Sequence, residues 1–126
     1  MGTSLLDRVR AIALALPEVT ERHSHGEPCF FVGGKRPICY FHDDHNGDGR
    51  VSIWCPAPIG AQDELVRVDP RRFFRPQPSA SGVFADWIGV FLDQPLSAAD
   101  WHEIAQIVTD AFRLVAPQRL TRLLDA

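Results

Sequence analysis

The sequence predicts an α+β fold of two layers, in which an antiparallel sheet is covered on one face by an N-terminal helix and a C-terminal helix. Amphipathic helical patterns occur near both ends of the chain, and short runs of strand-forming residues occupy the middle. Turns rich in glycine, asparagine and aspartate separate those runs. With 126 residues, 45% of them hydrophobic, the chain is long enough for a single domain over residues 1–126 with one buried core.

The first elements are a helix and a hairpin. Apolar residues recur at helical spacing from Leu5 to Leu16, and Pro17 ends the pattern. Two strands are expected next, at Cys29 to Val32 and at Ile38 to His42. Gly33-Gly34 lies between them and accepts the positive φ angles of a tight hairpin turn. These strands therefore pair in antiparallel fashion.

The middle of the chain adds two more strands. The polar segment Asp43 to Arg50 contains the turn dipeptides Asn-Gly and Asp-Gly, so we expect it to connect to a third strand at Val51 to Cys55. A short helix is predicted at Ala61 to Val66, and an irregular proline-rich passage at Phe73 to Pro78. The last strand is predicted at Trp87 to Leu92.

The second long helix begins with a capping signal, Ser97 followed three residues later by Asp100. An apolar stripe then runs from Trp101 to Val115, and Pro117 ends the helix. Leucines at 120, 123 and 124 suggest a final short turn. Strands followed by a helix that packs on the sheet complete the α+β assignment.

Charge and cysteine content exclude several classes of protein. Thirteen basic and sixteen acidic residues give a net charge of −3, which provides no general attraction for nucleic acid or for an anionic membrane. Cys29, Cys39 and Cys55 are odd in number and lack CxxC spacing, so we expect buried free thiols rather than disulfides or a zinc site. No segment resembles a signal peptide or a membrane span. The expectation is a cytoplasmic protein with no membrane partner.

Four segments carry a resemblance to a known family: ALPEVTERHSHGEPCFFVGGKR, VSIWCPAP, GAQDELVRVDPRRFF and WIGVFLD. They cover nearly the whole chain, and their order is more specific than any one of them. The chain resembles the MmcQ/YjbR family, which implies a compact fold similar to that of frataxin-like (CyaY-like) proteins. Members are usually labelled DNA-binding. Asp86 and Phe91 depart from the family pattern, because members often carry a His-Arg-Gly approach and an arginine in this region.

The nucleic-acid candidates are two local groups of basic residues, Lys35 and Arg36 at the hairpin tip, and Arg71, Arg72 and Arg75 around two phenylalanines. No helix-turn-helix, zinc-finger or RNA-binding signature accompanies them. We therefore expect a non-catalytic protein that binds DNA weakly and without sequence specificity. The alternative is a solvated loop whose arginines pair with nearby acids.

An aromatic sheet face offers an alternative function. Helices expected on one face only would leave the other face to aromatic side chains, for which the candidates are Phe30, Tyr40, Trp54 and Trp87. Such a face suits a protein partner, self-association or a small ligand. Loops and the C-terminal tail covering this face are the competing interpretation.

Metal, cofactor and catalytic sites are not expected. His23, His25 and Glu27 alternate, which in an extended segment would place them on one side, and His42 and His45 follow in the next strand and loop. No HExxH or CxxC spacing supports a metal site, so an ordinary polar strand entrance is the favoured interpretation. The sequence leaves open whether His23, His25, His42 and His45 converge. It also shows no nucleophile elbow and no phosphate- or dinucleotide-binding glycine loop.

Overall fold

A computed structural model describes residues 2–77 and 80–125, and within them six strands form one sheet in the order β1-β2-β3-β4-β6-β5. Every neighbouring pair of strands is antiparallel. The strands are β1 (Val19–Ser24), β2 (Glu27–Val32), β3 (Arg36–Asp43), β4 (Val51–Cys55), β5 (Phe73–Phe74) and β6 (Ile88–Phe91). The helices are α1 (Gly2–Ala13), α2 (Ala61–Val68), α3 (Ala98–Val115) and α4 (Gln118–Leu124), with a 3₁₀ turn η1 (His45–Gly47). The predicted α+β fold is confirmed.

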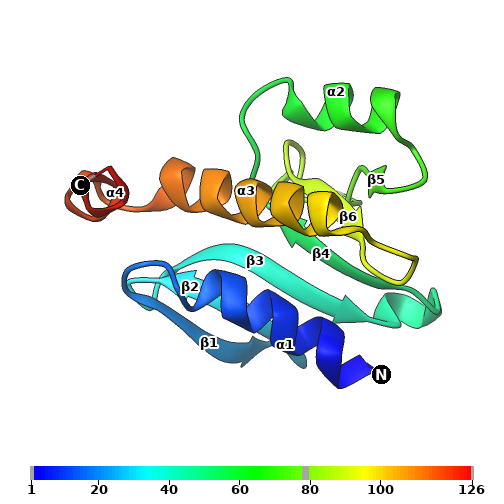
Figure 1. Cartoon of the computed structure of the whole chain (residues 1–126), viewed down its shortest axis with the longest axis horizontal. Coiled ribbons are helices and arrows are strands. Elements are labelled where there is room, and N and C mark those ends of the chain that lie inside the picture. The colour runs from blue at the N-terminus through cyan, green and yellow to red at the C-terminus, as the bar shows by residue number, and fades with distance from the viewer. Residues whose placement is uncertain (1, 78–79, 126) are drawn as a thin grey trace.

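Helices α1 and α3 lie side by side on one face of the sheet, while α2 stands apart beyond β5 and β6 (Figure 1). The core lies between α1, α3 and the strands. Val9 from α1, Phe30 and Ile53 from the sheet, and Ile104 and Phe112 from α3 have no exposed surface. Burying each of these side chains stabilises the fold by about 1.5–3 kcal/mol. Within the described residues, no helix covers the other face of the central strands.

The helix ends differ in how well the sequence predicts them. Helix α3 has the predicted capping box, because the Ser97 hydroxyl accepts from the Asp100 N–H and the Asp100 carboxylate accepts from the Ser97 N–H. Helix α1 ends at Ala13, earlier than predicted, and the buried Leu16 belongs to the turns that follow. No helix among the described residues is long and apolar enough to span a membrane.

The Gly33-Gly34 turn is confirmed, with φ angles of 61° and 71°. The four predicted strands are also present, within one or two residues at most ends. Strand β1 and the two-residue strand β5 are additional. Strand β1 joins β2 through a turn at His25-Gly26, whose φ angles are 55° and 84°. The chain from His23 to Glu27 is therefore not one extended segment, which is the condition under which the alternating side chains would share one side.

Candidate ligand pocket and histidine cluster

Strands β3 and β4 present polar and aromatic side chains on the face that α1 and α3 leave uncovered. Tyr40 pairs with Trp54 across the two strands, and His42 pairs with Ser52. Side chains directly opposite each other in a sheet share one face, so these four side chains lie together. Cys39 and Phe41 of β3 belong to the core instead.

A cavity of about 620 Å³ opens on this face. This volume lies within the range of sites for small molecules. Its lining comes from β1, β2, β3, β4, the turn after β3 and the loop before β6: Ser24, His25, Glu27, Pro28, Tyr40, His42, His45, Asn46, Asp48, Trp54, Gln77 and Phe84. Two carboxylates but no lysine or arginine occur among these described lining residues.

One wall of the pocket is a cluster of aromatic rings. Phe84, carried by the loop between β5 and β6, packs edge-on against Trp54 and Tyr40 at centroid distances of 5.3 and 5.8 Å. Trp87 lies behind them, 5.5 Å from Tyr40 and 4.9 Å from Phe84. Edge-to-face geometry at these distances is the favourable arrangement for aromatic pairs. The rings therefore hold the part of the loop that carries Phe84 against the sheet.

The sequence-predicted aromatic face corresponds to this wall in part. Tyr40 and Trp54 line the pocket, and Trp87 supports it. Phe30 does not belong to it, because its partner in the register is Cys39, on the helix-covered face, and its side chain is fully buried in the core. Phe84 was missed because it lies in a turn-rich segment with no strand pattern of its own.

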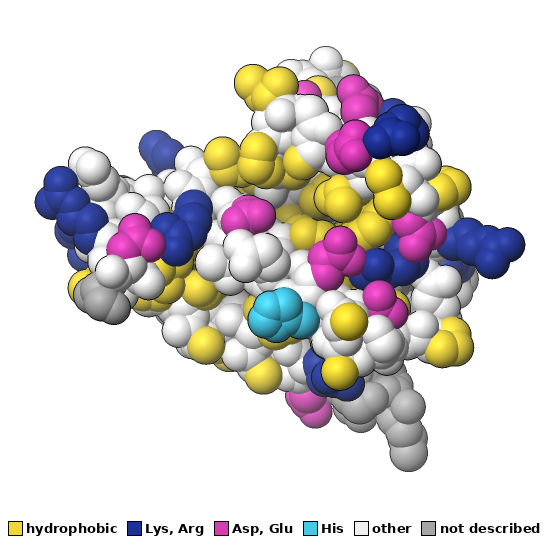
Figure 2. Space-filling model, turned by 45° about the horizontal axis from the view of Figure 1, so that its top comes forward, with side chains coloured by type: hydrophobic (Ala, Val, Ile, Leu, Met, Phe, Trp, Pro, Cys, Tyr) yellow, Lys and Arg dark blue, Asp and Glu magenta, His cyan; other side chains and the backbone are white. Residues whose placement is uncertain are grey.

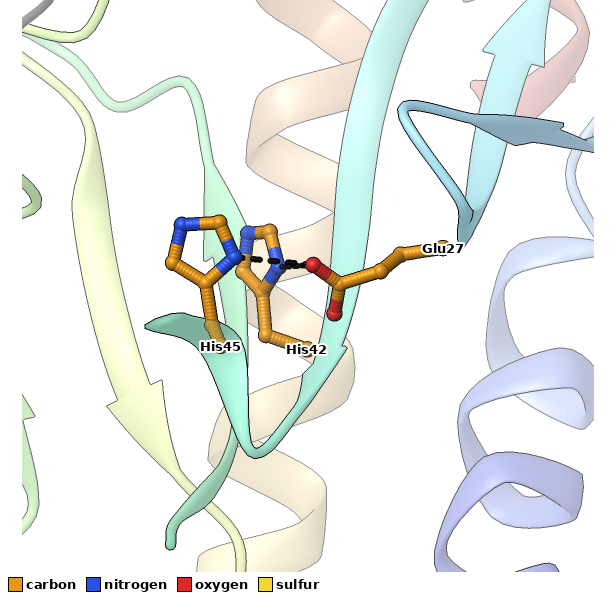
Figure 3. Close-up of side chains that lie close together, drawn as sticks. All are labelled: Glu27, His42 and His45. Atoms are coloured by element: carbon orange, nitrogen blue, oxygen red, sulfur yellow. Dashed lines mark hydrogen bonds and ion pairs between the residues drawn. The ribbon is translucent and has the colours of Figure 1, made fainter. Parts of the chain in front are cut away.

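A polar cluster of Glu27, His42 and His45 forms another part of the pocket (Figure 3). Glu27 begins β2, His42 lies near the end of β3, and His45 begins η1. The left-handed backbone at Asp44 and Asn46, with φ of 61° and 54°, turns the chain back on itself after β3. This turn places the His45 ring beside the His42 ring, with centroids 4.2 Å apart and planes tilted by 48°.

Both imidazoles point toward the same carboxylate oxygen. Nδ1 of His45 lies 2.8 Å from Oε1 of Glu27, and Nδ1 of His42 lies 2.9 Å from it. The contact with His45 has hydrogen-bond geometry. The approach of His42 is close but poorly aligned, so neither ring nitrogen of His42 has a hydrogen-bond partner among the described residues. With 5% of its surface exposed, His42 is a buried polar group whose hydrogen-bonding capacity is unsatisfied.

The environment sets the protonation of this cluster. Burial lowers the pKa of His42 below its ordinary value, although the neighbouring Glu27 opposes the shift. For Glu27, burial favours the neutral form, but the hydrogen bond with His45, the close approach of His42 and a hydrogen bond from the Asp43 N–H together outweigh it, so its net pKa is lowered. The cluster therefore holds a neutral imidazole against an ionised carboxylate.

The four histidines named in the sequence behave differently. His42 and His45 meet, and His25 reaches the pocket rim from the turn between β1 and β2. His23 is exposed on β1 and is absent from the lining. Because the chain turns at His25-Gly26, the side chains of His23 and His25 point in different directions, which the alternating sequence pattern could not reveal.

The predicted arginine group around β5 is largely paired with acids. Arg72 is 15% exposed, and its Nη1 lies 2.7 Å from Glu103 and 3.3 Å from Asp100. Arg75 pairs with Asp63 at 2.8 Å. On the face shown in Figure 2, basic side chains lie in separate groups with acidic side chains beside them. This distribution weakens the local positive field that phosphate binding requires.

The two basic groups also lie far apart. Arg36 donates to the carbonyl of Val115 at the end of α3, whereas Arg72 contacts Asp100 in its first turn. At a rise of 1.5 Å per residue, these two points of α3 are about 22 Å apart. Lys35 and Arg71 remain exposed, and no ion pair involves the side chain of either residue in residues 2–77 and 80–125.

The three cysteines are buried free thiols, as predicted. Burial raises the pKa of Cys29 to about 12, and the pKa of Cys39 is also raised, by its contact with Cys55 and by burial. Protonated, inaccessible thiols are poor nucleophiles and poor metal ligands. The chemistry available at the pocket is therefore that of imidazole, carboxylate and aromatic groups.

Comparisons with known proteins identify the fold and the family. The model of the YjbR family matches residues 14–114. Among solved structures, the chain is similar to Deinococcus radiodurans protein DR2400, described with the domain DUF419, at a TM-score of 0.69 and 18% sequence identity over 95% of this chain and 87% of that chain. At this identity the likeness shows the fold alone. No curated protein matches the chain.

Proposed function

This chain belongs to the YjbR family, and for this member we propose a non-catalytic function, the binding of a small organic ligand in the pocket on the helix-free face of the sheet. The observation that carries the proposal is the combination of an aromatic wall with a buried imidazole, His42, whose nitrogens make no well-aligned hydrogen bond within the described residues. Apolar walls with a few convergent polar groups are typical of ligand sites. A ligand that bonds to His42 would satisfy it.

The lining residues favour one class of ligand. Tyr40, Trp54 and Phe84 suit a planar ring, which gains from stacking and edge contacts. Glu27 and Asp48 contribute negative charge, with no basic side chain among the described lining residues to offset it. We therefore expect a neutral or cationic planar ligand, and weaker binding of a planar anion.

The experiment is a titration of the isotope-labelled protein followed by NMR amide shifts. The probes are benzimidazole, tryptamine and benzoate, all planar but different in charge. Benzimidazole and tryptamine should shift resonances of β2, β3 and η1 saturably, and benzoate should bind at least about tenfold more weakly. Phe84→Ala removes one wall and should weaken binding by a similar factor, whereas Leu114→Ala, an exposed position on α3, should not.

Two results would contradict the proposal. One is that none of the probes shifts the lining resonances at millimolar concentration. The other is that all three probes bind equally and the Phe84 and Leu114 variants respond alike, which would indicate nonspecific adsorption rather than a formed pocket.

The support for a non-catalytic role comes from the groups that face the pocket. Ser24 is the hydroxyl in the lining that most resembles a nucleophile, and its interaction is with Tyr40 rather than with an imidazole base. An activated nucleophile needs a base within hydrogen-bond reach. The described lining residues therefore support binding better than covalent catalysis.

Weak, non-specific DNA binding is a second candidate function, favoured by the exposure of Lys35 and Arg71. Each residue offers a cation for a phosphate, but the two lie near opposite ends of α3. Fluorescence anisotropy of labelled DNA at several salt concentrations measures how many phosphates are neutralised. We expect a shallow slope of log Kd against log salt, and its loss in a Lys35→Glu, Arg71→Glu double variant. The absence of binding at low salt would exclude this function.

A further inference from the structure

We propose that Glu27, His42 and His45 bind a divalent first-row transition-metal ion. The inference deepens the proposed function and rests on it in one respect, because the ion would form part of the pocket surface that an organic ligand meets. The three side chains come from β2, β3 and η1, so the fold rather than a sequence motif brings them together (Figure 3).

The donor atoms are already close to metal-binding geometry. One ligand atom from each residue lies within 4.8 Å of the others. With metal–donor bonds of about 2.0–2.1 Å, donors of a tetrahedral site lie about 3.3 Å apart. The Nδ1 atoms of His42 and His45 are 2.9 and 2.8 Å from Oε1 of Glu27. An ion therefore requires the donors to separate by about half an ångström.

The turn that carries His45 allows this small adjustment. Its side chain is 32% exposed, and it lies in a short 3₁₀ turn rather than in the sheet. His42 and Glu27 belong to paired strands, which fix two of the three ligands before any ion binds. A site with two fixed ligands and one adjustable ligand is partly preorganised.

The unsatisfied imidazole is the second, independent observation. Only 5% of the surface of His42 is exposed, and neither of its ring nitrogens makes a hydrogen bond within the described residues. Its Nδ1 nevertheless points at the carboxylate oxygen that His45 also contacts. A metal ion between the three groups would accept the nitrogen lone pair and replace a poorly aligned contact with a bond.

Protonation in the cluster agrees with this assignment. Metal ligands must be neutral imidazole and ionised carboxylate. Burial lowers the pKa of His42, while the contacts with the imidazoles outweigh burial and lower the pKa of Glu27. Both shifts favour the protonation states that an ion needs from these two ligands.

The ligand set identifies the class of ion. Two imidazoles and one carboxylate suit zinc, cobalt, nickel, copper or ferrous iron better than magnesium or calcium, which prefer oxygen ligands alone. The three thiols are buried elsewhere and belong to no such group among the described residues. Three protein ligands leave at least one coordination position for water or a ligand group.

The test uses the full chain without a histidine tag, after treatment with a chelator and removal of the chelator. Zinc binding is measured by calorimetry, and cobalt binding by visible absorption and by quenching of tryptophan fluorescence. Quenching is informative because the rings of His42 and His45 lie 4.4 and 5.2 Å from that of Trp54. We expect one equivalent of either ion and a metal-dependent increase in Tm.

Variants separate this site from other histidines. His45→Ala and Glu27→Gln should each weaken zinc binding by at least about tenfold, the size of effect known even for groups that only support a ligand. The matched controls are His23→Ala, which changes an exposed imidazole of β1 outside the pocket lining, and His102→Ala, which changes an exposed imidazole of α3. Both should bind zinc as the unaltered protein does. Circular dichroism confirms that each variant folds.

The outcomes separate this inference from the proposed function. If benzimidazole binds but zinc does not, or if zinc binds equally to the His45 and His102 variants, the metal site is refuted while the pocket stands. If one equivalent of zinc binds and is lost with His45, but no planar probe binds, the metal site stands and the organic-ligand proposal fails.

Discussion

Lowering the pH from 7.5 to 5.5 should destabilise this protein through His42. The pKa of His42 in the folded protein lies below the ordinary value of 6.5, chiefly because of burial. The unfolded chain therefore binds more protons than the folded chain in this window. The contribution of His42 to the stability of the fold is fully present above pH 6.5, and it is lost as the pH falls toward the pKa of His42 in the folded protein.

The magnitude follows from proton linkage. If His42 stays neutral in the folded protein down to pH 5.5, only the unfolded chain takes up this proton, and the free energy of unfolding decreases by up to about 1.4 kcal/mol between pH 7.5 and 5.5. Glu27 has a lowered pKa and remains ionised across the window, so its own shift contributes only at more acidic pH. The carboxylate, His45 and Asp48 are the charged or titratable neighbours that act on His42.

Urea unfolding of the metal-free protein at the two pH values measures this effect. His42→Phe removes the titrating group and fills the space, so the change in its free energy of unfolding between the two pH values should be smaller by up to about 1.4 kcal/mol. His102→Ala, at an exposed site, should keep the full change. The reasoning is refuted if the unaltered protein is equally stable or more stable at pH 5.5, because Glu27 would then stabilise a charged His42.

Three further predictions concern stability, measured by urea unfolding at neutral pH. Gly89→Ala should destabilise the fold by about 1–3 kcal/mol, because the new Cβ would overlap the Phe74 ring; an unchanged midpoint would show that the ring moves freely. Ser97→Ala should cost about 1 kcal/mol through loss of the cap, and Ser97→Asp should restore most of it. Arg72→Met should cost about 1 kcal/mol, because Asp100 and Glu103 lose their cationic partner, and it should leave DNA binding unchanged. A loss of DNA affinity would show that this guanidinium contacts the phosphates of DNA.

Local sequence patterns were sufficient for the central elements of the fold. Strand β4 has the predicted bounds, and the Gly33-Gly34 turn and the Ser97 capping box occur as expected. Each of these depends on residues adjacent in sequence. Strand β1 was missed because it lies at the sheet edge and carries Glu21, Arg22 and His23, whose polarity hides the alternation that identifies a strand.

The faces of the strands were harder to assign. In β2 the run from Cys29 to Val32 is apolar at every position, so periodicity does not show which side chains face the helices. A shift in the register between Phe30 and Phe31 complicates the alternation further. For this reason the prediction that Phe30 lies on the helix-free face was wrong. Tyr40 and Trp54 alternate with core residues in their strands, so the pattern placed them together on that face.

The histidine cluster depends on backbone conformations that residue types alone do not specify. Asp44 and Asn46 adopt the left-handed region, which aspartate and asparagine tolerate but do not require. Without that turn, His45 would continue away from the sheet and His42 would face Glu27 alone. A polar loop composition therefore predicts a turn, whereas the convergence of three ligands requires its geometry.

The same dependence on geometry explains why a group of arginines in the sequence is weak evidence for a nucleic-acid site. Arg72 and Arg75 lie close in sequence, but their acidic partners come from α3 and α2, far away along the chain. These long-range ion pairs balance the charges of the arginines, whereas His42 in the pocket makes no well-aligned hydrogen bond within the described residues. Two buried nitrogens of Arg72 also lack hydrogen bonds among these residues, but that guanidinium already has its counterions, whereas His42 lines a pocket that a ligand can enter, so His42 is the stronger indication of a ligand.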